Sequence, residues 1–460
     1  CWEESLSRLM PCWLASPESV SAIFPMEKDF FDLVIFDEAS QCYVERALPV
    51  MLRGKACVIA GDDKQLPPFD LYNVKIEEDE EEIDEIGMAL EVESALDLAR
   101  GIFTEVHLSW HYRSVEEELI NFSNYAFYGG RLNVIPPARI TEQPPIEFNR
   151  VNGTWDRNRN IDEAKAVIET VEKLVQQPDA PTMGIVTFNF QQKELIRDLL
   201  EQRMRELIWS GNHDLLKLYR QALFREEKEE RQGLFIKNIE NVQGDERDVI
   251  IFSIAYARNH AGKLTSNFGL LNQKGGENRL NVAITRARQK VIVICSFNPI
   301  EMDVENALNP GPRLFKQYLL YASAVHQGDP EMIGQILKRI GGSNPTPASA
   351  PIQGQEGNEL ADLVAQDLEK RGYQIIRGIG DTNYKLDLAV YDEQKGYLLG
   401  IECEGRQYFA GKSSKEREVY RYRLLERRGW KLHRVWARNY YLDREKELNK
   451  MVDMIQEMNK

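Results

Sequence analysis

Residues 31–40 read FDLVIFDEAS, an apolar run that ends in two acidic residues, Asp37 and Glu38. Short apolar runs of this kind alternate with amphipathic helical stretches before residue 341, which is the pattern of a parallel α/β sheet. A carboxylate just beyond such a strand can hold Mg²⁺, and its neighbour can polarise an attacking water molecule. The stretch therefore predicts an NTPase-type strand, with Asp37 as a metal ligand and Glu38 as a catalytic carboxylate.

Four further motifs follow this strand along the chain. They are VIAGDDKQLPP at 58–68, LSWHYRS at 108–114, IENVQGDERDVIIFS at 239–253 and NRLNVAITRARQKV at 278–291. This ordered set resembles the superfamily 1 helicases, in particular the branch typified by the nonsense-mediated-decay helicase. The resemblance implies two RecA-like lobes around one ATP molecule and 5′ to 3′ movement along a nucleic-acid strand.

The resemblance also implies roles for individual residues around the nucleotide. In the first lobe, Asp37 would bind the metal ion and Gln65 would sense the γ-phosphate. In the second lobe, Arg113 and Arg286 would contact phosphate oxygens, which suit the planar fork of a guanidinium group. The family motif that couples the nucleotide to the nucleic-acid groove corresponds to Gln243, Gly244 and Glu246.

One segment near the C-terminus imitates a phosphate-binding loop, because Gly411 is followed by Lys412 and a serine. A Walker A loop has four residues between its glycines, whereas five separate Gly405 from Gly411. No other G-K-[ST] sequence occurs in the chain. We therefore expect a truncated first lobe, and little ATP binding or hydrolysis by this chain alone. A preceding segment of a longer helicase, or a partner subunit, would supply the missing loop.

The last hundred or so residues form a separate predicted domain. The Gly-, Pro- and Ser-rich segment 341–357 is typical of a flexible linker, and the elements predicted after it follow the order α-β-β-β-α-β. That order, together with YKLDLAV (384–390), GIECEG (400–405) and LLERRGWKLHRVWA (424–437), resembles the PD-(D/E)XK nucleases. The closest likeness is to the group of very-short-patch-repair endonucleases.

Side-chain alternation along two of these strands predicts a metal site. Asp387 points away from the apolar face of its strand, and Glu402 and Glu404 point away from the apolar face of theirs. If the strands pair as a hairpin, three carboxylates converge, and such like charges require a cation when buried. Oxygen ligands favour Mg²⁺ or Mn²⁺, which can activate water for phosphodiester cleavage.

The nuclease resemblance adds further catalytic residues, and the sequence departs from the family pattern at Glu404 and at Phe409, where the subgroup often has histidine. Glu359, which opens the first helix, stands where the family's helix glutamate would lie. Glu404 occupies the position where the superfamily usually has a lysine. The role of that lysine would fall to Lys385 or Lys412, or would be dispensed with.

The charge of the chain is distributed unevenly. The net charge of −15 opposes nucleic-acid binding, but residues 77–85 alone hold eight acids. Residues 411–438 hold ten Lys and Arg against three Glu, interleaved with aromatic side chains, which favours a nucleic-acid surface. The six scattered cysteines and the absence of any membrane-length apolar run predict a cytoplasmic protein without a membrane partner.

These observations predict an α/β protein with a partial first RecA-like lobe, a complete second lobe and a small PD-(D/E)XK domain. The expected divisions are the partial lobe at 1–104, the second lobe at 105–305, a helical connector at 306–340, the linker at 341–357 and the nuclease-like domain at 358–460.

The expected function is an ATP-dependent helicase or translocase on single-stranded DNA. A tethered Mg²⁺-dependent endonuclease would act on duplex or single-stranded DNA, in defence against foreign DNA or in DNA repair. RNA is an open alternative as the substrate. The rival hypotheses are a translocase whose degenerate nuclease domain only binds DNA, and a non-catalytic assembly subunit.

Overall fold

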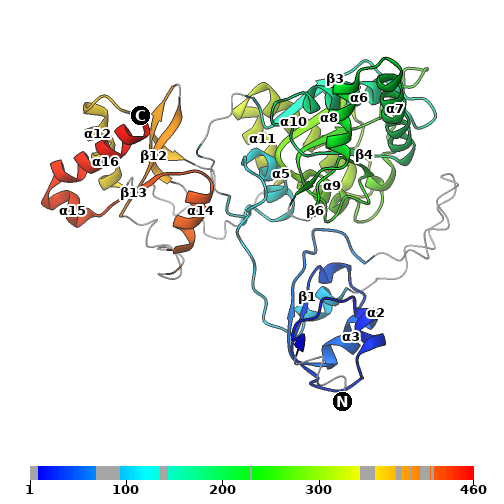
Figure 1. Ribbon diagram of the computed structural model, residues 1–460, viewed down its shortest axis with the longest axis horizontal. Coiled ribbons are helices and arrows are strands. Elements are labelled where there is room, and N and C mark those ends of the chain that lie inside the picture. The colour runs from blue at the N-terminus through cyan, green and yellow to red at the C-terminus, as the bar shows by residue number, and fades with distance from the viewer. Residues whose placement is uncertain are drawn as a thin grey trace. The chain divides into compact units, whose positions relative to one another are not determined.

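The computed structural model describes most of the chain (Figure 1). The described residues are 9–68, 94–134, 138, 143–227, 230–341, 358–379, 386–393, 395–404, 415 and 419–459. They divide into two compact units, Cys1–His107 and Leu108–Lys460. No helix in these ranges combines the length and the apolar character needed to cross a membrane.

The first unit is built around two parallel strands. Its elements are α2 (Pro17–Ile23), β1 (Phe31–Phe36), the short 3₁₀ helix η1 (Ala39–Gln41), α3 (Val44–Leu52), β2 (Gly54–Ile59) and α4 (Ala95–Arg100). Strand β1 pairs in parallel with β2, and α3 makes the crossover that parallel pairing requires. Val34 and Phe36 on β1 pack against Ala47 and Val50 on α3 in a small apolar core. The strand predicted from FDLVIFDEAS is therefore confirmed.

The second unit begins with a five-stranded, wholly parallel sheet in the order β3-β9-β8-β4-β7. Its strands are β3 (Ile146–Arg150), β4 (Met183–Thr187), β7 (Phe235–Asn238), β8 (Arg247–Ser253) and β9 (Ala287–Cys295). Its helices are α5 (Glu118–Phe127), α6 (Ile161–Val175), α7 (Phe190–Trp209), α8 (His213–Leu223), α9 (Gly276–Ile284), α10 (Gly311–Gln327) and α11 (Pro330–Ile340). The short elements are β5 (Glu226–Glu227), β6 (Glu230–Arg231), η4 (Gly269–Asn272) and η5 (Pro299–Glu301). A parallel sheet of this kind is typical of a RecA-like lobe.

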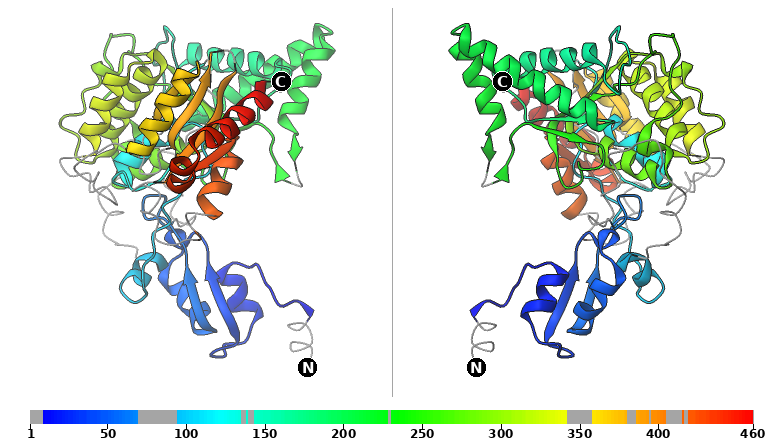
Figure 2. Two further views of the ribbon diagram at one scale, coloured as in Figure 1. Left: turned by 90° about the vertical axis from the view of Figure 1, so that its left-hand side faces the viewer. Right: turned by 90° about the vertical axis from the view of Figure 1, so that its right-hand side faces the viewer.

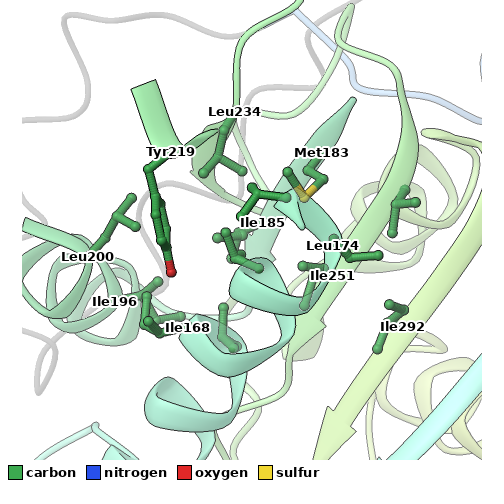
Figure 3. Packing of buried hydrophobic residues seen from close by; sticks show 14 of the residues in the cluster. Ile168, Leu174, Met183, Ile185, Ile196, Leu200, Tyr219, Leu234, Ile251 and Ile292 are labelled. Atoms are coloured by element: carbon green, nitrogen blue, oxygen red, sulfur yellow. The ribbon is translucent and has the colours of Figure 1, made fainter. Parts of the chain in front are cut away.

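The core of this lobe follows from helical and strand periodicity. Asn160 caps α6 by accepting a hydrogen bond from the Glu163 backbone N–H, which starts the helix. The apolar residues of α6 then recur at three- and four-residue spacing and pack onto the sheet. Figure 3 shows Ile168 and Leu174 of this helix beside Ile185, Ile251 and Ile292 of the strands. Tyr219 of α8 is fully buried in the same cluster, so α7 and α8 belong to the lobe's core.

The C-terminal part of the second unit is a smaller α/β domain with a four-stranded sheet. Its elements are α12 (Glu359–Lys370), β10 (Gln374–Ile379), β11 (Leu386–Asp392), β12 (Gly396–Cys403), α14 (Arg421–Arg427), β13 (Leu432–Val435), α15 (Ala437–Leu442) and α16 (Arg444–Asn459). Strands β10, β11 and β12 are antiparallel neighbours, and β13 joins β12 in parallel. The predicted α-β-β-β-α-β order is confirmed, and the helices α15 and α16 follow it.

The face of this sheet that α12 and α16 cover is apolar. Val364 of α12 and Met451 of α16 pack against Leu388, Leu399 and Ile401 of the strands. Figure 2 shows α12 and α16 beside these strands. Because side chains alternate along a strand, the residues between the apolar positions point to the opposite face. That opposite face carries the candidate nuclease residues.

Candidate functional site

In the first unit, Asp37 and Glu38 lie in the turn that follows β1. Glu38 has a positive φ of 52°, and its backbone N–H donates to the Asp37 carboxylate at 3.0 Å. A left-handed conformation is unfavourable for a residue with a Cβ atom, so its occurrence after this strand indicates a conformation imposed by the surroundings. Both side chains are exposed, which leaves them accessible to a metal ion or a nucleotide.

Gln65 belongs to the neighbouring loop, which follows β2. Its side-chain amide donates to Asp62 Oδ2 at 3.0 Å, so its position is fixed within the loop. The loop after β2 approaches the turn after β1 closely at Gly61, where an added Cβ would lie 2.9 Å from the Ser40 backbone nitrogen. Because β1 and β2 are parallel, their carboxyl ends bring Gln65 to the same edge as Asp37.

In the second unit, a glutamate lies between two arginines. Arg113 Nε donates to Glu246 Oε2 at 2.6 Å, and Arg288 donates to Glu246 Oε1 at 2.8 Å. Burial would raise the pKa of the Glu246 carboxyl, but the hydrogen bonds from these arginines lower it below its ordinary value. The three side chains form a charged cluster that carries one net positive charge.

Backbone contacts fix this cluster in place. Val115 N donates to Arg288 O at 2.7 Å, so the HYRS segment runs alongside the start of β9. The partly buried His111 accepts a hydrogen bond from Ser114 N at Nε2. Burial, together with the positive charge of Arg113 and its neighbours, lowers the pKa of His111 to about 3. The uncharged imidazole therefore supports the loop that carries Arg113.

The remaining motif residues of the lobe lie around the same strands. Arg286 is only 2% exposed, and its Nε donates to the Val282 carbonyl at 2.7 Å. Gln243 and Gly244 lie in the turn between β7 and β8, where Gly244 adopts a positive φ of 81°. Only a glycine adopts this conformation readily, which explains the residue at that position.

In the C-terminal domain, Asp387 and Glu402 are neighbours across two strands. The antiparallel pairing of Leu388 with Ile401 places Asp387 opposite Glu402, on the face of the sheet opposite to α12 and α16. Asp387 Oδ2 accepts a hydrogen bond from Cys403 N at 2.8 Å. Burial raises the pKa of the Asp387 carboxyl, and the charge of Glu402 adds to that rise.

Glu402 is held by two arginines. Its Oε1 accepts from Arg421 Nε at 2.6 Å, and its Oε2 accepts from Arg434 at 3.1 Å. Glu402 lies on β12 directly beside Arg434 on β13, in register. Only 7% of the Glu402 side chain is exposed. This carboxylate is therefore buried and charge-compensated by protein groups.

The expected convergence of three carboxylates is not found. Glu404 Oε2 accepts from Ala437 N at 3.0 Å, so this side chain serves the start of α15. Within the described ranges, no three His, Cys, Asp or Glu side chains lie close enough together to hold a metal ion. Glu359 is exposed at the start of α12. Lys385 and Lys412 lie outside the described residues.

The donor set fits a divalent cation only in part. Asp387 and Glu402 supply two carboxylates on one face, and burial raises the pKa of the Asp387 carboxyl, with the charge of Glu402 adding to that rise. Glu402, however, already has both oxygens engaged by arginines. Metal binding by both carboxylates therefore requires Glu402 to leave those partners.

Comparison with known protein families places three segments of the chain. Residues 18–71 and 98–298 each match the model of an AAA domain, and residues 361–455 match the REase_MTES_1575 family. The first part of the chain therefore consists of helicase domains of superfamily 1, of the branch typified by the nonsense-mediated-decay helicase. At its C-terminus the chain carries a nuclease-like domain of the REase_MTES_1575 family.

Relatives with helicase names align over most of the chain. The ATP-dependent helicase MG140 homolog of Mycoplasma pneumoniae is 32% identical over 95% of this chain, and helicase MG140 of Mycoplasma genitalium is 32% identical over 96%. The helicase MJ0104 of Methanocaldococcus jannaschii is 26% identical over 59% of this chain and 37% of its own length. The chain spans 38% of the length of each Mycoplasma relative.

Sequence reasoning missed several residues of these sites. Arg288 shares Glu246 with Arg113, and its signal was its place in the TRARQ stretch, two residues after Arg286. Arg421 and Arg434 were recognised only as members of a basic stretch. Their pairing with Glu402 depends on how β12, β13 and α14 come together, which no local pattern states.

Proposed function

We propose that this chain is part of an ATP-dependent helicase or translocase with a tethered metal-dependent DNA endonuclease. The observation that carries the proposal is the placement of Asp387 opposite Glu402 on one face of a nuclease-like sheet, in a chain whose preceding segments are helicase domains. Foreign DNA, or DNA under repair, is the proposed target. Single-stranded DNA is the proposed track of the motor, with RNA as the alternative.

The nuclease half of the proposal rests on a divalent cation, for which Mg²⁺ or Mn²⁺ suits the oxygen ligands. Asp387 and Glu402 would hold the ion, which would supply an activated water molecule and stabilise the leaving oxygen. Glu404 and Glu359, and Lys385 or Lys412 as the basic group, complete the set of candidate catalytic residues. The backbone N–H of Cys403 orients the Asp387 carboxylate toward this site.

The motor half of the proposal needs a Walker A loop, which this chain does not contain. We propose that a further segment of the same protein or a partner subunit supplies it, while Asp37, Glu38 and Gln65 contribute from the first unit. Arg113, Gln243, Gly244, Glu246 and Arg286 would contribute from the second lobe. The chain alone should then hydrolyse ATP slowly, and Glu38→Gln should change that rate no more than Glu45→Gln, which alters an exposed residue of α3. Rapid hydrolysis that depends on Glu38 would contradict this part of the proposal.

Cleavage of supercoiled, linear and single-stranded DNA with Mg²⁺ or Mn²⁺, without ATP, tests the nuclease half. The key comparison is Asp387→Asn with Asp392→Asn, which removes the same charge at the other end of the same strand. We expect cleavage by the wild type and by Asp392→Asn, and at least a hundredfold slower cleavage by Asp387→Asn. Equal cleavage by both variants would mean that Asp387 is not a metal ligand.

A second candidate function is DNA binding by the C-terminal domain without cleavage. It is favoured by the engagement of Glu402 with Arg421 and Arg434, which satisfies the carboxylate without a metal ion. This candidate predicts DNA affinity that survives Asp387→Asn and no cleavage of any substrate by the wild type. A chain with neither affinity nor cleavage would instead fit a non-catalytic assembly subunit.

A further inference from the structure

The two arginines on Glu402 are positioned by different elements of the C-terminal domain. Arg421 is the first residue of α14, and Arg434 lies on β13 in register with Glu402. Each arginine side chain is 13% exposed, so both keep a limited opening to solvent. The Arg434 guanidinium also lies over the Trp436 ring, 5.6 Å from its centroid. These contacts hold two planar donor groups at the candidate cleavage face.

The charges at this face balance without any added ion. When ionised, the carboxylates of Asp387 and Glu402 carry two negative charges, which the two positive charges of Arg421 and Arg434 balance. A divalent cation bound by the carboxylates would leave a local charge of about +2, which is costly in a poorly solvated site. A phosphodiester bound by the arginines would offset part of that excess. Guanidinium groups suit phosphate oxygens as well as they suit carboxylates.

We propose that Arg421 and Arg434 bind the phosphodiester of the nucleic acid, and that Glu402 exchanges between these arginines and the metal ion. This inference rests on the proposed nuclease function and adds its substrate contact. In the resting chain, Glu402 occupies the arginines and blocks the phosphate site. Phosphate binding releases Glu402 toward the metal, and metal binding releases the arginines toward the phosphate.

The exchange makes metal and phosphate binding mutually dependent. Each should raise the affinity of the other by the same factor, because linkage between two binding sites is reciprocal. Occupation of one site commonly changes the affinity of a coupled site by about 5- to 150-fold, so we expect a change on the order of tenfold here. A buried ion pair with only a structural role would give no such coupling.

Mn²⁺ binding to the full chain, followed by electron paramagnetic resonance of the free ion, tests the exchange. The probe for the phosphate site is thymidylyl-thymidine, which has one phosphodiester and is too short to span the groove of a helicase. The Mn²⁺ that Asp387→Asn still binds is the amount bound at other sites of the chain, and it is subtracted. The test variant is Arg421→Gln, and Arg423→Gln is the matched control, since Arg423 is an exposed residue of the same helix.

In the wild type and in Arg423→Gln, we expect the dinucleotide to tighten Mn²⁺ binding on the order of tenfold. In Arg421→Gln, Mn²⁺ alone should bind more tightly than in the wild type, because Glu402 has lost one competitor. The dinucleotide should then have little further effect. Circular dichroism confirms folding. Should Arg421→Gln not fold, Arg434→Lys keeps the charge without the fork and should lose most of the dinucleotide effect.

Two results would overturn the inference. One is Mn²⁺ affinity that is independent of the dinucleotide in the wild type. The other is dinucleotide coupling of equal size in Arg421→Gln and Arg423→Gln. Either can occur while Asp387-dependent cleavage of DNA persists, so the inference can fail although the proposed nuclease function holds. Coupling in a chain that cleaves no DNA would support the inference and contradict the nuclease function alone.

Discussion

Replacement of Glu163 by glutamine tests the electrostatics of the second lobe directly. Glu163 is fully buried, and its carboxyl group contacts Ser296 Oγ at 2.6 Å and Ala255 N at 2.7 Å. Burial raises the pKa of Glu163 to about 8, although its hydrogen bonds oppose that rise. Ala255 and Ser296 follow the carboxyl ends of β8 and β9, whereas Arg286 precedes β9. The change is therefore remote from the arginine cluster.

The expected effect follows from proton linkage. The ordinary pKa of this carboxyl is 4.5, so between pH 4.5 and about pH 8 the folded lobe binds one proton more than the unfolded chain. The extra proton stabilises the folded lobe, and this stabilisation is fully present below pH 4.5. Between pH 4.5 and about pH 8 it decreases by about 1.4 kcal/mol per pH unit, and it is lost above that range. Between pH 6 and pH 8, the wild type should lose about 2 kcal/mol that Glu163→Gln does not lose.

Hydrogen exchange of peptides from α6 and β8 reports the stability of this lobe separately from the rest of the chain. Exchange is measured at pH 6, 7 and 8, and each variant is compared with the wild type at the same pH. The protection of Glu163→Gln relative to the wild type should grow on the order of 30-fold from pH 6 to pH 8. Glu169→Gln, at an exposed position of α6, should show no such trend.

The glutamine also faces the Asn160 side-chain amide, which donates to Glu163 Oε1 at 3.2 Å. A donor placed against a donor there would cost about 1 kcal/mol at every pH. The test is therefore how the difference in protection between Glu163→Gln and the wild type changes with pH. The sign of that difference at any one pH does not decide the question. A constant difference between Glu163→Gln and the wild type would refute the raised pKa and the reasoning built on it.

Two further substitutions have defined outcomes. Glu246→Gln removes the carboxylate that two arginines share; since about a third of its side chain is exposed, the second lobe should lose roughly 1–2 kcal/mol, measured as faster hydrogen exchange in β8 and β9. Gly61→Ala places a Cβ 2.9 Å from the Ser40 backbone nitrogen and should destabilise the first unit by about 1–3 kcal/mol, measured by proteolysis. The control Gly101→Ala, where the nearest atom would be 3.7 Å away, should leave proteolysis unchanged.

Features that depend on local geometry could be predicted from the sequence. The apolar run before Asp37 gave a strand with its carboxylates at the carboxyl end, because parallel sheets present polar residues there. The two-residue period of strands placed Asp387 and Glu402 on one face, and the antiparallel register then brought them opposite each other. Neither inference needs knowledge of distant contacts.

Features that depend on a competing partner could not be predicted. Glu404 shares the strand period of Glu402, yet the free N–H groups at the start of α15 attract its carboxylate. Asn160 and Glu163 match the capping-box pattern at the start of a helix. That pattern does not reveal that the Glu163 carboxyl is buried and accepts a hydrogen bond from Ser296. In each case a residue from a distant segment decides what the side chain does.

Net charge was a poor guide to the candidate phosphate-binding groups because each of them is compensated locally. Glu246 lies between Arg113 and Arg288, which leaves one excess positive charge in that cluster. Glu402 lies between its own two arginines, and the neighbouring Asp387 balances the second of them. This compensation hides the clusters from any sum over the chain, including the value of −15.

Burial makes the two clusters behave differently. The Glu246 side chain is 33% exposed, so water screens its pairs and an anion can approach the arginines without displacing it. The Glu402 side chain is 7% exposed, where a third anion without a compensating cation would be costly. Phosphate binding by Arg421 and Arg434, the partners of Glu402, should therefore depend on a metal ion. Phosphate binding by Arg113 and Arg288, the partners of Glu246, should not.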